Sequence, residues 1–494
     1  MSEKTDRRTY LKVVGGTVGG LVVGGAIGYL AKPSEAVEKT ITQTQTLTKT
    51  VTATAPAVTT TPVQLTGPDH ALVMLMGGYR PDMVKANLGE FDKQWGVPSS
   101  TATELQQLSG DLIVAQEAKL AAGAPVDICL SYPYSTVTWA KAGWIQTIDD
   151  IKPTADGVVV YDMKDIKKEL YKNLQDAFSV DGKLYGLPYY NSCIGAKLTN
   201  EKLFDRAGMS GEYPKTHQEF YEMLPKLKAK CQADEYPFLA PYYNEPFGIP
   251  WSWLYETMNQ GGAAAMFDDK PPYGPTFDVG TLAEDVLKDW KDTWDKEYTP
   301  HSVLTMKQTD FLGAFSTGKY FIHDNADYYL GYMNNPAKSQ MAGDCGLVPP
   351  VTQPWGMMDA AIYVLANRKG RTEKDQHYAE AFMEFLGYKD RNGVFYVPKR
   401  WGIEESLQSG FPGVVEDPDV KAAYQKRLRK PEDLQTIGKL LEMMNFCPAW
   451  KAAWYTKWNT RTLTELPLVL TGEKSIKDVV TTLRSYADEL VKGA

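Results

Sequence analysis

The sequence predicts an α/β protein built from two lobes that are joined by extended crossover segments. Strand and helix patterns alternate near the start of the globular part, where an apolar strand at 71–76 precedes an amphipathic helix at 84–95. A helix at 111–122 and a strand at 126–130 follow. Repeated βα order is typical of a parallel or mixed sheet with helices on both faces. Further along the chain, an extended segment at 181–191 separates two such halves.

The predicted crossover lies within residues 181–209. Pro188 restricts Leu187 to extended backbone, so the Tyr-Tyr-Asn segment at 189–191 follows as a strand or linker and not as a helix. Two aromatic residues and an amide at a crossover between lobes favour a ligand cleft at this point. An ordinary edge strand with surface tyrosines would show the same pattern, so the residues alone leave both interpretations open.

Length and composition limit the classes of function. A chain of 494 residues allows two or three folding units, and 43% hydrophobic with 23% charged residues is ordinary for soluble globular protein. The net charge of −8 argues against a nucleic-acid partner, because binding phosphates needs a basic surface. Five widely spaced cysteines form no C-x-x-C pair, and five scattered histidines show no metal-ligand spacing. The sequence therefore predicts no metal site and no cofactor.

Residues 1–36 predict an export signal. The basic segment TDRRTYLK at 5–12 precedes an uncharged, glycine-rich and valine-rich run at 13–31, and small residues follow. The pair Arg7-Arg8 with its following aromatic residue resembles a twin-arginine signal, which implies the twin-arginine export machinery as a partner. The uncharged run is close to the length that spans a bilayer, so cleavage of the signal and its retention as an anchor both stay open. We expect the protein at the outer face of the cytoplasmic membrane or at the cell surface.

A threonine-rich stalk is predicted at 37–69, before a solute-binding domain at 70–494. The segment 40–66 is dominated by threonine and has few bulky apolar side chains. Such a segment cannot bury enough surface to offset the entropy lost on ordering.

Motifs after residue 180 follow one another in a recognisable order. The segment 181–209 combines D-G-K-x-Y-G-x-P-x-Y with an N-x-x-L-F-x-x-A-G helix. FSTGKYFIHD at 315–324, CGLVPP at 345–350 and EAFMEFL at 380–386 come next, and GEKSIKDV begins a closing helix at 472. Together these motifs resemble the family 1 extracellular solute-binding proteins of ABC importers, the group that includes maltose-binding protein.

The resemblance covers about residues 70–494 and implies a two-lobed periplasmic-binding-protein fold of type II, with discontinuous lobes and Venus-flytrap closure. VPKR at 397–400 resembles the P-x-R turn of the family. The two crossovers lie side by side in this fold, and Cys193 and Cys345 flank them, so a disulfide at the hinge is a further hypothesis. The implied lobe boundaries are about 70–189 and 349–395 for lobe 1, and about 192–346 and 396–494 for lobe 2.

The same resemblance implies the solute-binding component of an ABC importer, which delivers its ligand to the membrane subunits of a permease. A separate cytoplasmic ATPase is expected, since the chain has no G-x-x-x-x-G-K-[ST] motif. The 12% aromatic content points to a carbohydrate, because sugar rings stack on aromatic rings. The segment FCPAW at 446–450 lies before a helix and resembles the segment that carries the aromatic stacking residue of oligosaccharide binders, which implies an oligosaccharide. One alternative is an exported glycan-degrading enzyme. Its two catalytic carboxylates must lie at a set distance in space but need no fixed spacing in the sequence, so the sequence does not exclude them. The other is the same fold binding a peptide or another polar solute.

The predicted ligand-binding residues lie in segments expected to face the cleft. Aromatic residues would stack on the ligand, and Asp, Asn and Arg would bind its hydroxyl groups. For each aromatic residue, including those of the Trp-Ser-Trp-Leu-Tyr segment at 251–255, a place in the core is the alternative. The expected stacking residues are Tyr79, Tyr132, Tyr189, Tyr190, Trp253, Trp355 and Trp450. The expected hydrogen-bonding residues are Arg80, Asp111, Asn191, Asp324 and Asp359.

Overall fold

The computed structural model places the globular part of the chain in one compact unit, Pro62–Ala494. The predicted signal at 1–36 and the stalk residues 37–64 lie outside the described residues. The structure describes residues 65–77, 79–108, 112–151, 154–155, 158–159, 163–349, 360–366, 369–443 and 445–493.

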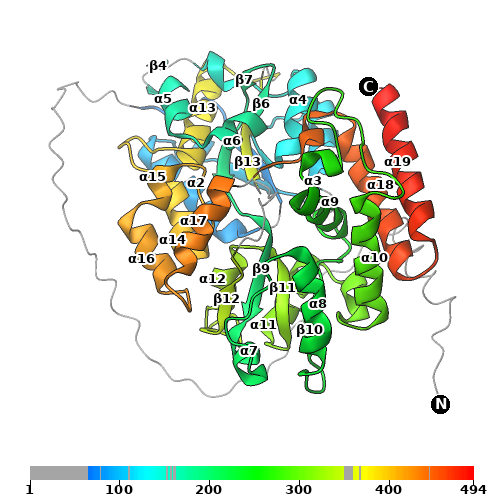
Figure 1. Ribbon diagram of the computed structural model, residues 1–494. Coiled ribbons are helices and arrows are strands. Elements are labelled where there is room, and N and C mark those ends of the chain that lie inside the picture. Colours follow the sequence, from blue (N-terminus) through cyan, green and yellow to red (C-terminus); the bar gives the residue numbers. More distant parts are fainter. Residues whose placement is uncertain are drawn as a thin grey trace, which may run out of the picture. The chain divides into compact units, whose positions relative to one another are not determined.

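Two mixed sheets form the centres of two lobes (Figure 1). Within the described residues, the first sheet has five strands in the order β2, β1, β3, β13, β8. Strands β2 and β3 run parallel to β1, whereas β13 runs antiparallel to both β3 and β8. The bounds are β1 Val73–Met76, β2 Glu104–Gln107, β3 Ile128–Ser131, β8 Leu187–Tyr190 and β13 Ala360–Val364.

The second sheet has four strands in the described part of the chain, in the order β10, β11, β9, β12. Strand β10 runs parallel to β11, and β9 runs antiparallel to β11 and β12. The bounds are β9 Ile194–Asn200, β10 Tyr236–Leu239, β11 Tyr320–Ala326 and β12 Cys345–Leu347. The chain leaves the first sheet after β8, enters the second at β9, and returns from β12 to β13. Each lobe is therefore discontinuous in sequence, as predicted, while the finer lobe boundaries stay predictions.

Helices cover both sheets. The predicted face of the first long helix is confirmed, because Val84, Leu88, Phe91 and Trp95 are at most 4% exposed. Helices α2 Pro81–Gln94, α3 Leu112–Ala121 and α13 Glu373–Gly387 pack on the first sheet. Helices α7 Glu201–Ala207, α8 His217–Lys228, α9 Ile249–Gly261, α12 Tyr329–Met333 and α17 Asp433–Met443 pack on the second.

A helical layer extends the second lobe, where α18 and α19 lie beside α9 and α10 (Figure 1). Its bounds are α10 Leu282–Asp295, α18 Tyr455–Leu470 and α19 Ile476–Lys492. The remaining helices are α4 Thr136–Lys141, α5 Met163–Glu169, α6 Lys172–Ala177, α11 Gln308–Ser316, α14 Tyr396–Glu405, α15 Pro412–Val415 and α16 Pro418–Gln425. Two short strand pairs are β4 Thr154–Ala155 with β5 Val158–Val159, and β6 Ser179–Val180 with β7 Lys183–Leu184.

The prediction of a turn at 397–400 is wrong, because these residues belong to the first turns of helix α14. Pro398 is the third residue of that helix. The first four N–H groups of a helix have no partner within it, so a proline there removes no hydrogen bond. The P-x-R pattern therefore marks the start of a helix.

The hinge disulfide hypothesis is also wrong, since no disulfide joins Cys193 and Cys345, which are both buried. Cys193 precedes β9, whereas Cys345 pairs with Asn200 at the opposite end of that strand. Seven residues of strand span about 23 Å, far beyond the Cα separation of about 7 Å that a disulfide allows.

The end of the predicted stalk contacts the globular unit. The backbone N–H of Gly67 donates to the Tyr378 hydroxyl at 2.9 Å, and that of His70 donates to Asp375 at 2.8 Å. Gly67 and His70 thus dock on α13.

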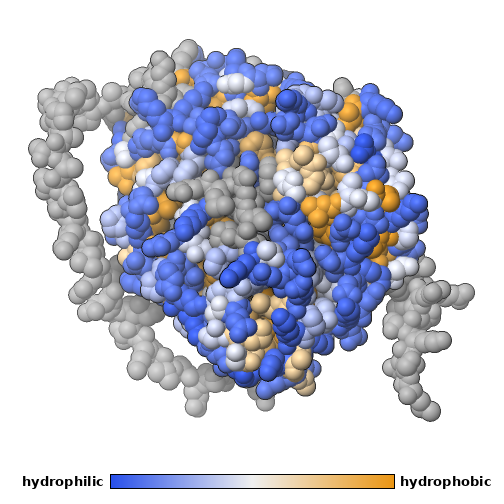
Figure 2. Space-filling view, viewed as in Figure 1, coloured by the Kyte–Doolittle hydropathy of each residue, from blue (hydrophilic) through white to orange (hydrophobic). Residues whose placement is uncertain are grey.

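The visible face of the molecule is mainly hydrophilic, with apolar side chains in small separate groups (Figure 2). No helix among the described residues combines the length and the apolar character that crossing a membrane requires.

Candidate functional site

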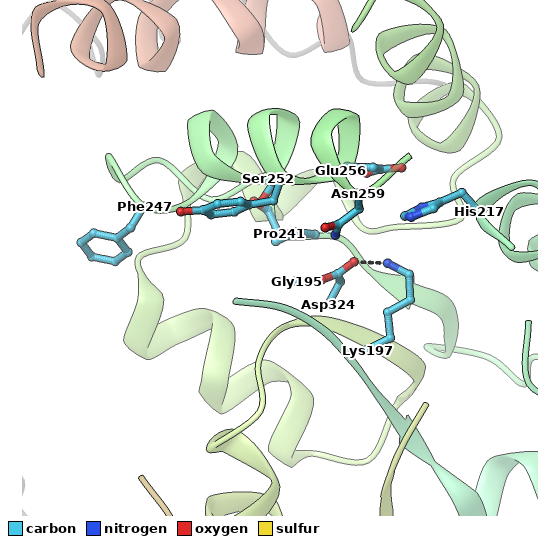
Figure 3. Close-up of a pocket in the computed structure, with 10 residues that line it drawn as sticks. Gly195, Lys197, His217, Pro241, Phe247, Ser252, Glu256, Asn259 and Asp324 are labelled. Atoms are coloured by element: carbon cyan, nitrogen blue, oxygen red, sulfur yellow. Dashed lines mark hydrogen bonds and ion pairs between the residues drawn. The ribbon is translucent and has the colours of Figure 1, made fainter. Parts of the chain in front are cut away.

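A pocket lies at the end of the second sheet that is nearest the crossover from β8 (Figure 3). Its volume is about 390 Å³, including the solvent at its mouth. Four elements and one loop contribute side chains, so the site depends on the tertiary fold. The lining residues are Gly195 and Lys197 of β9, Asp324 of β11, His217 of α8, Pro241 and Phe247 of the loop after β10, and Ser252, Tyr255, Glu256 and Asn259 of α9.

The local periodicity of two elements explains which residues line the pocket. Gly195 and Lys197 are two positions apart on β9, so they share one face of the sheet. The four residues of α9 lie at positions i, i+3, i+4 and i+7, which form one helix face. Figure 3 shows this face above the strand residues, with the Lys197–Asp324 pair below it. The pocket is therefore enclosed between one strand face and one helix face.

Lys197 and Asp324 form an ion pair on the floor of the pocket. They are direct partners in the antiparallel register of β9 and β11, and their side chains are 12% and 13% exposed. Lys197 also lies 4.7 Å from the centre of the Phe220 ring, a favourable cation–π position. The predicted ligand residue Asp324 is thus in the pocket, and Lys197 is held between it and an aromatic face.

Glu256 lies deeper, beneath α9. Its carboxylate accepts hydrogen bonds from the Tyr221 hydroxyl and, at 2.8 Å, from the Trp290 indole N–H. Burial raises the pKa of Glu256 to about 7, although the charge of Lys197 opposes that rise. The carboxyl group is therefore partly protonated near neutral pH.

His217 closes the side of the pocket formed by α8. The residue is 9% exposed, and its Nδ1 has no hydrogen-bond partner among the described residues. Burial, aided by the charge of Lys197, lowers the pKa of His217 to about 3. The ring is consequently neutral at physiological pH.

An aromatic cluster links the pocket to the first lobe. Tyr132 follows β3 of the first sheet, and its ring centre lies 6.3 Å from Phe247 and 5.9 Å from Trp251. Tyr134 joins Tyr132 to Trp450, with ring centres 5.7 Å and 5.9 Å away. Tyr132 and Phe247 are partly exposed, whereas Trp450 is only 3% exposed. The cluster brings together the predicted residues Tyr132 and Trp450.

Three further predicted aromatic residues gather around Trp401 of α14. The ring of Tyr79 stacks on Trp401 at 6.1 Å, and Tyr189 and Tyr190 each lie 5.2 Å from it. Tyr79 is partly exposed, whereas Tyr189 and Tyr190 are 1% and 7% exposed. Tyr79 also contacts Tyr328 of the second lobe at 6.1 Å.

The other described candidates have intramolecular partners. Arg80 forms ion pairs with Asp82, at 2.8 Å, and with Glu405. Asn191 is 1% exposed, and its backbone exchanges hydrogen bonds of 2.7 and 2.9 Å with Gln408.

Trp253 lies in the core of the helical layer. It is fully buried, its indole N–H donates to the Ala283 carbonyl at 2.9 Å, and Phe277 and Trp458 pack on its ring. The candidates Asp111, Trp355 and Asp359 lie outside the described residues.

The sequence prediction missed Trp401 and most of the pocket, including Lys197, His217, Glu256 and Asn259. The helix-face spacing of α9 was a usable signal, because a polar Ser, Glu and Asn recur on one side of a helix whose other residues are mostly apolar. His217 gave no such signal, since its place depends on how α8 packs against β9. Across the described residues, no group of three or more His, Cys, Asp or Glu side chains is arranged to hold a metal ion.

Comparisons with known proteins give one family and many similar structures. Residues 102–389, more than half of the chain, match the bacterial extracellular solute-binding protein family. A search of curated proteins finds none that matches this sequence.

Three similar solved structures carry sugar or polyol names. Maltose-bound MalE3 of T. maritima has a TM-score of 0.66 and 17% identity, over 86% of this chain and 100% of that one. A chitin oligosaccharide binding protein has a TM-score of 0.67 and 19% identity, over 86% and 99%. A solute-binding protein of Agrobacterium radiobacter in complex with ribitol has a TM-score of 0.67 and 16% identity, over 86% and 99%. At these identities the likeness establishes the fold.

Proposed function

Because the chain belongs to the bacterial extracellular solute-binding protein family, we propose that it captures a carbohydrate, and an oligosaccharide in particular, between its two lobes for an ABC importer. The observation that carries this proposal is the pocket next to the crossover, where charged and amide groups lie beside partly exposed aromatic rings. Such a combination suits a sugar, whose hydroxyls need polar partners and whose ring has apolar faces. Similar structures named for maltose, chitin oligosaccharide and ribitol support the same ligand class.

We propose Tyr132, Phe247, Asn259 and Asp324 as ligand contacts in the described part of the chain. All four are partly exposed and lie in or beside the pocket. Asp111, Trp355 and Asp359 remain proposed contacts on sequence grounds. Tyr79 and Arg80 are proposed at the edge of the cleft, while Trp253 is left out because its ring is enclosed.

The mechanism follows from contacts that a ligand makes with both lobes. A sugar held by the pocket of the second lobe gains further contacts from the loop after β3 only when the lobes approach. That differential affinity shifts the population toward the closed state. The closed protein would then dock on the membrane subunits of a permease that a separate cytoplasmic ATPase drives. Export by the twin-arginine machinery and a position at the outer face of the membrane complete the proposal.

Ligand-dependent unfolding of the purified protein tests this function. At a ligand concentration of about one hundred times Kd, a ligand specific for the folded state adds about 2.7 kcal/mol to the free energy of unfolding. We expect an increase in Tm with at least one sugar or polyol in a panel that also contains peptides. An assay for new reducing ends on the same samples identifies a glycan-degrading enzyme, because a binding protein leaves the sugar intact. An increase in Tm with peptides alone would show that the ligand is a peptide and not a sugar, and it would leave the fold assignment unchanged.

A further inference from the structure

The pocket holds one carboxylate more than it holds cations. Two of its lining side chains are acidic, Asp324 and Glu256, and one is basic, Lys197. His217 contributes no charge, since its buried ring is neutral. With both acids ionised, the pocket therefore carries a net charge of −1.

The excess charge belongs to Glu256. Lys197 pairs directly with Asp324, whereas no ion pair to Glu256 exists within the described residues. The two donors to Glu256 are the Tyr221 hydroxyl and the Trp290 indole, which are both neutral. The raised pKa of Glu256 fits this arrangement, because burial and the nearby charge of Asp324 both oppose its ionisation.

A second group in the pocket also has unused hydrogen-bonding capacity. Nδ1 of His217 is buried without a partner in the described structure, and a neutral imidazole can accept a hydrogen bond there in one of its tautomers. The His217 ring and the Glu256 carboxylate lie on the same side of the pocket in Figure 3, and Lys197 lies on that side as well. A carboxylate that has no ion-pair partner in the described part of the chain and an imidazole acceptor are both suited to an N–H donor of a ligand.

We propose that the pocket selects a sugar that bears an ammonium group, which enters beneath α9 and neutralises Glu256. The proposal rests on the proposed carbohydrate function and specifies the ligand class of the same site. The ammonium supplies three donors for Glu256, His217 and the pocket amide, while the sugar ring faces Phe247 and Tyr132 at the mouth. A carboxylated sugar is disfavoured, since it would add a third negative charge to the pocket.

Matched ligands test the proposal on the unmodified protein. Glucosamine, N-acetylglucosamine and glucose differ only in the group at C2, which is an amine, an acetamide or a hydroxyl. The dimers of glucosamine and of N-acetylglucosamine repeat the comparison for a longer sugar. We expect the free amine to bind about tenfold to a hundredfold more tightly than its acetylated or neutral counterpart, as measured by calorimetry at neutral pH. Equal or weaker binding of the amine, together with binding of a neutral sugar, overturns this inference and leaves the proposed function standing. A panel in which no sugar binds contradicts the proposed function itself.

Glu256→Gln provides the residue-level test, because glutamine keeps an acceptor for Tyr221 or Trp290 and removes the charge. The preference for the amine should then fall to about twofold or less, while binding of neutral sugars is retained. Glu222→Gln is the matched control: Glu222 is an exposed acid next to Tyr221 on α8, outside the pocket. A preference that persists in Glu256→Gln contradicts the role of this carboxylate. If that variant does not fold, the comparison of matched ligands on the unmodified protein still decides the proposal.

Discussion

At the scale of single residues, the protonation of Glu256 couples pH to folding. Its pKa is about 7 in the folded protein, above an ordinary value of 4.5, so the folded state binds more protons between these two values. The resulting contribution to stability is present below about pH 4.5 and is lost as the pH rises to about 7. Each unit of pKa corresponds to about 1.4 kcal/mol, and solvent reaches part of the Glu256 side chain, which weakens the effect of burial on stability. We therefore expect an effect on the order of 2 kcal/mol.

Urea unfolding at several values between about pH 5 and pH 8 measures this loss. The free energy of unfolding should fall with pH more steeply in the unmodified protein than in Glu256→Gln. Burial also raises the pKa values of Asp289 and Asp433 to about 6. These two residues lower the stability with rising pH equally in both proteins, so their effect cancels in the comparison. Parallel curves for the two proteins would show that Glu256 ionises normally.

At the scale of elements, two helices from different parts of the chain meet without space for a side chain. Gly331 of α12 faces Ser406, the residue that ends α14. A Cβ atom at residue 331 would lie 2.1 Å from the Ser406 hydroxyl oxygen and 2.6 Å from its Cβ. Ser406 has a positive φ of 60° at the end of its helix, so its backbone cannot easily move away.

Gly331→Ala should therefore lower the free energy of unfolding by about 1–3 kcal/mol, the usual cost of overpacking. Gly313→Ala on α11 is the matched control, because nothing lies within 4 Å of the added Cβ. Alanine there should leave stability unchanged or raise it by up to about 1 kcal/mol, since it favours the helix. Chemical denaturation of both variants measures the difference. A Gly331→Ala variant as stable as the control would mean that α12 and α14 can separate at little cost.

The elements that the sequence predicted well are those whose pattern is local. The first amphipathic helix was predictable because the helical spacing of Val84, Leu88 and Phe91 agrees with their burial in α2. The start of α14 was mispredicted, because a proline can end a helix or occupy its first turn. The pocket was mostly missed, since its charges meet only when β9, β11, α8 and α9 are packed together. Local periodicity shows which residues share a face but not which faces meet.

At the scale of the whole molecule, the two lobes meet through aromatic contacts that a ligand would extend. Tyr132 of the first lobe approaches Phe247 of the second, beside the pocket. Because Tyr132 is partly exposed, removing its ring should change the stability of the unliganded protein by about 1 kcal/mol or less. Its contribution should appear when a ligand is bound, since the closed state gains contacts from this loop.

Tyr132→Ala should weaken ligand binding by about tenfold or more, the equivalent of 1.4 kcal/mol from a lost stacking contact. Calorimetry gives the affinity, and small-angle X-ray scattering gives the radius of gyration with and without ligand. The unmodified protein should become more compact when the ligand is added, whereas the variant should need more ligand to reach the same compaction. Tyr486→Ala on α19, which contributes no residue to the pocket, is the matched control. Unchanged affinity in Tyr132→Ala would mean that the ligand is held by the second lobe alone, and closure would then require contacts from elsewhere in the first.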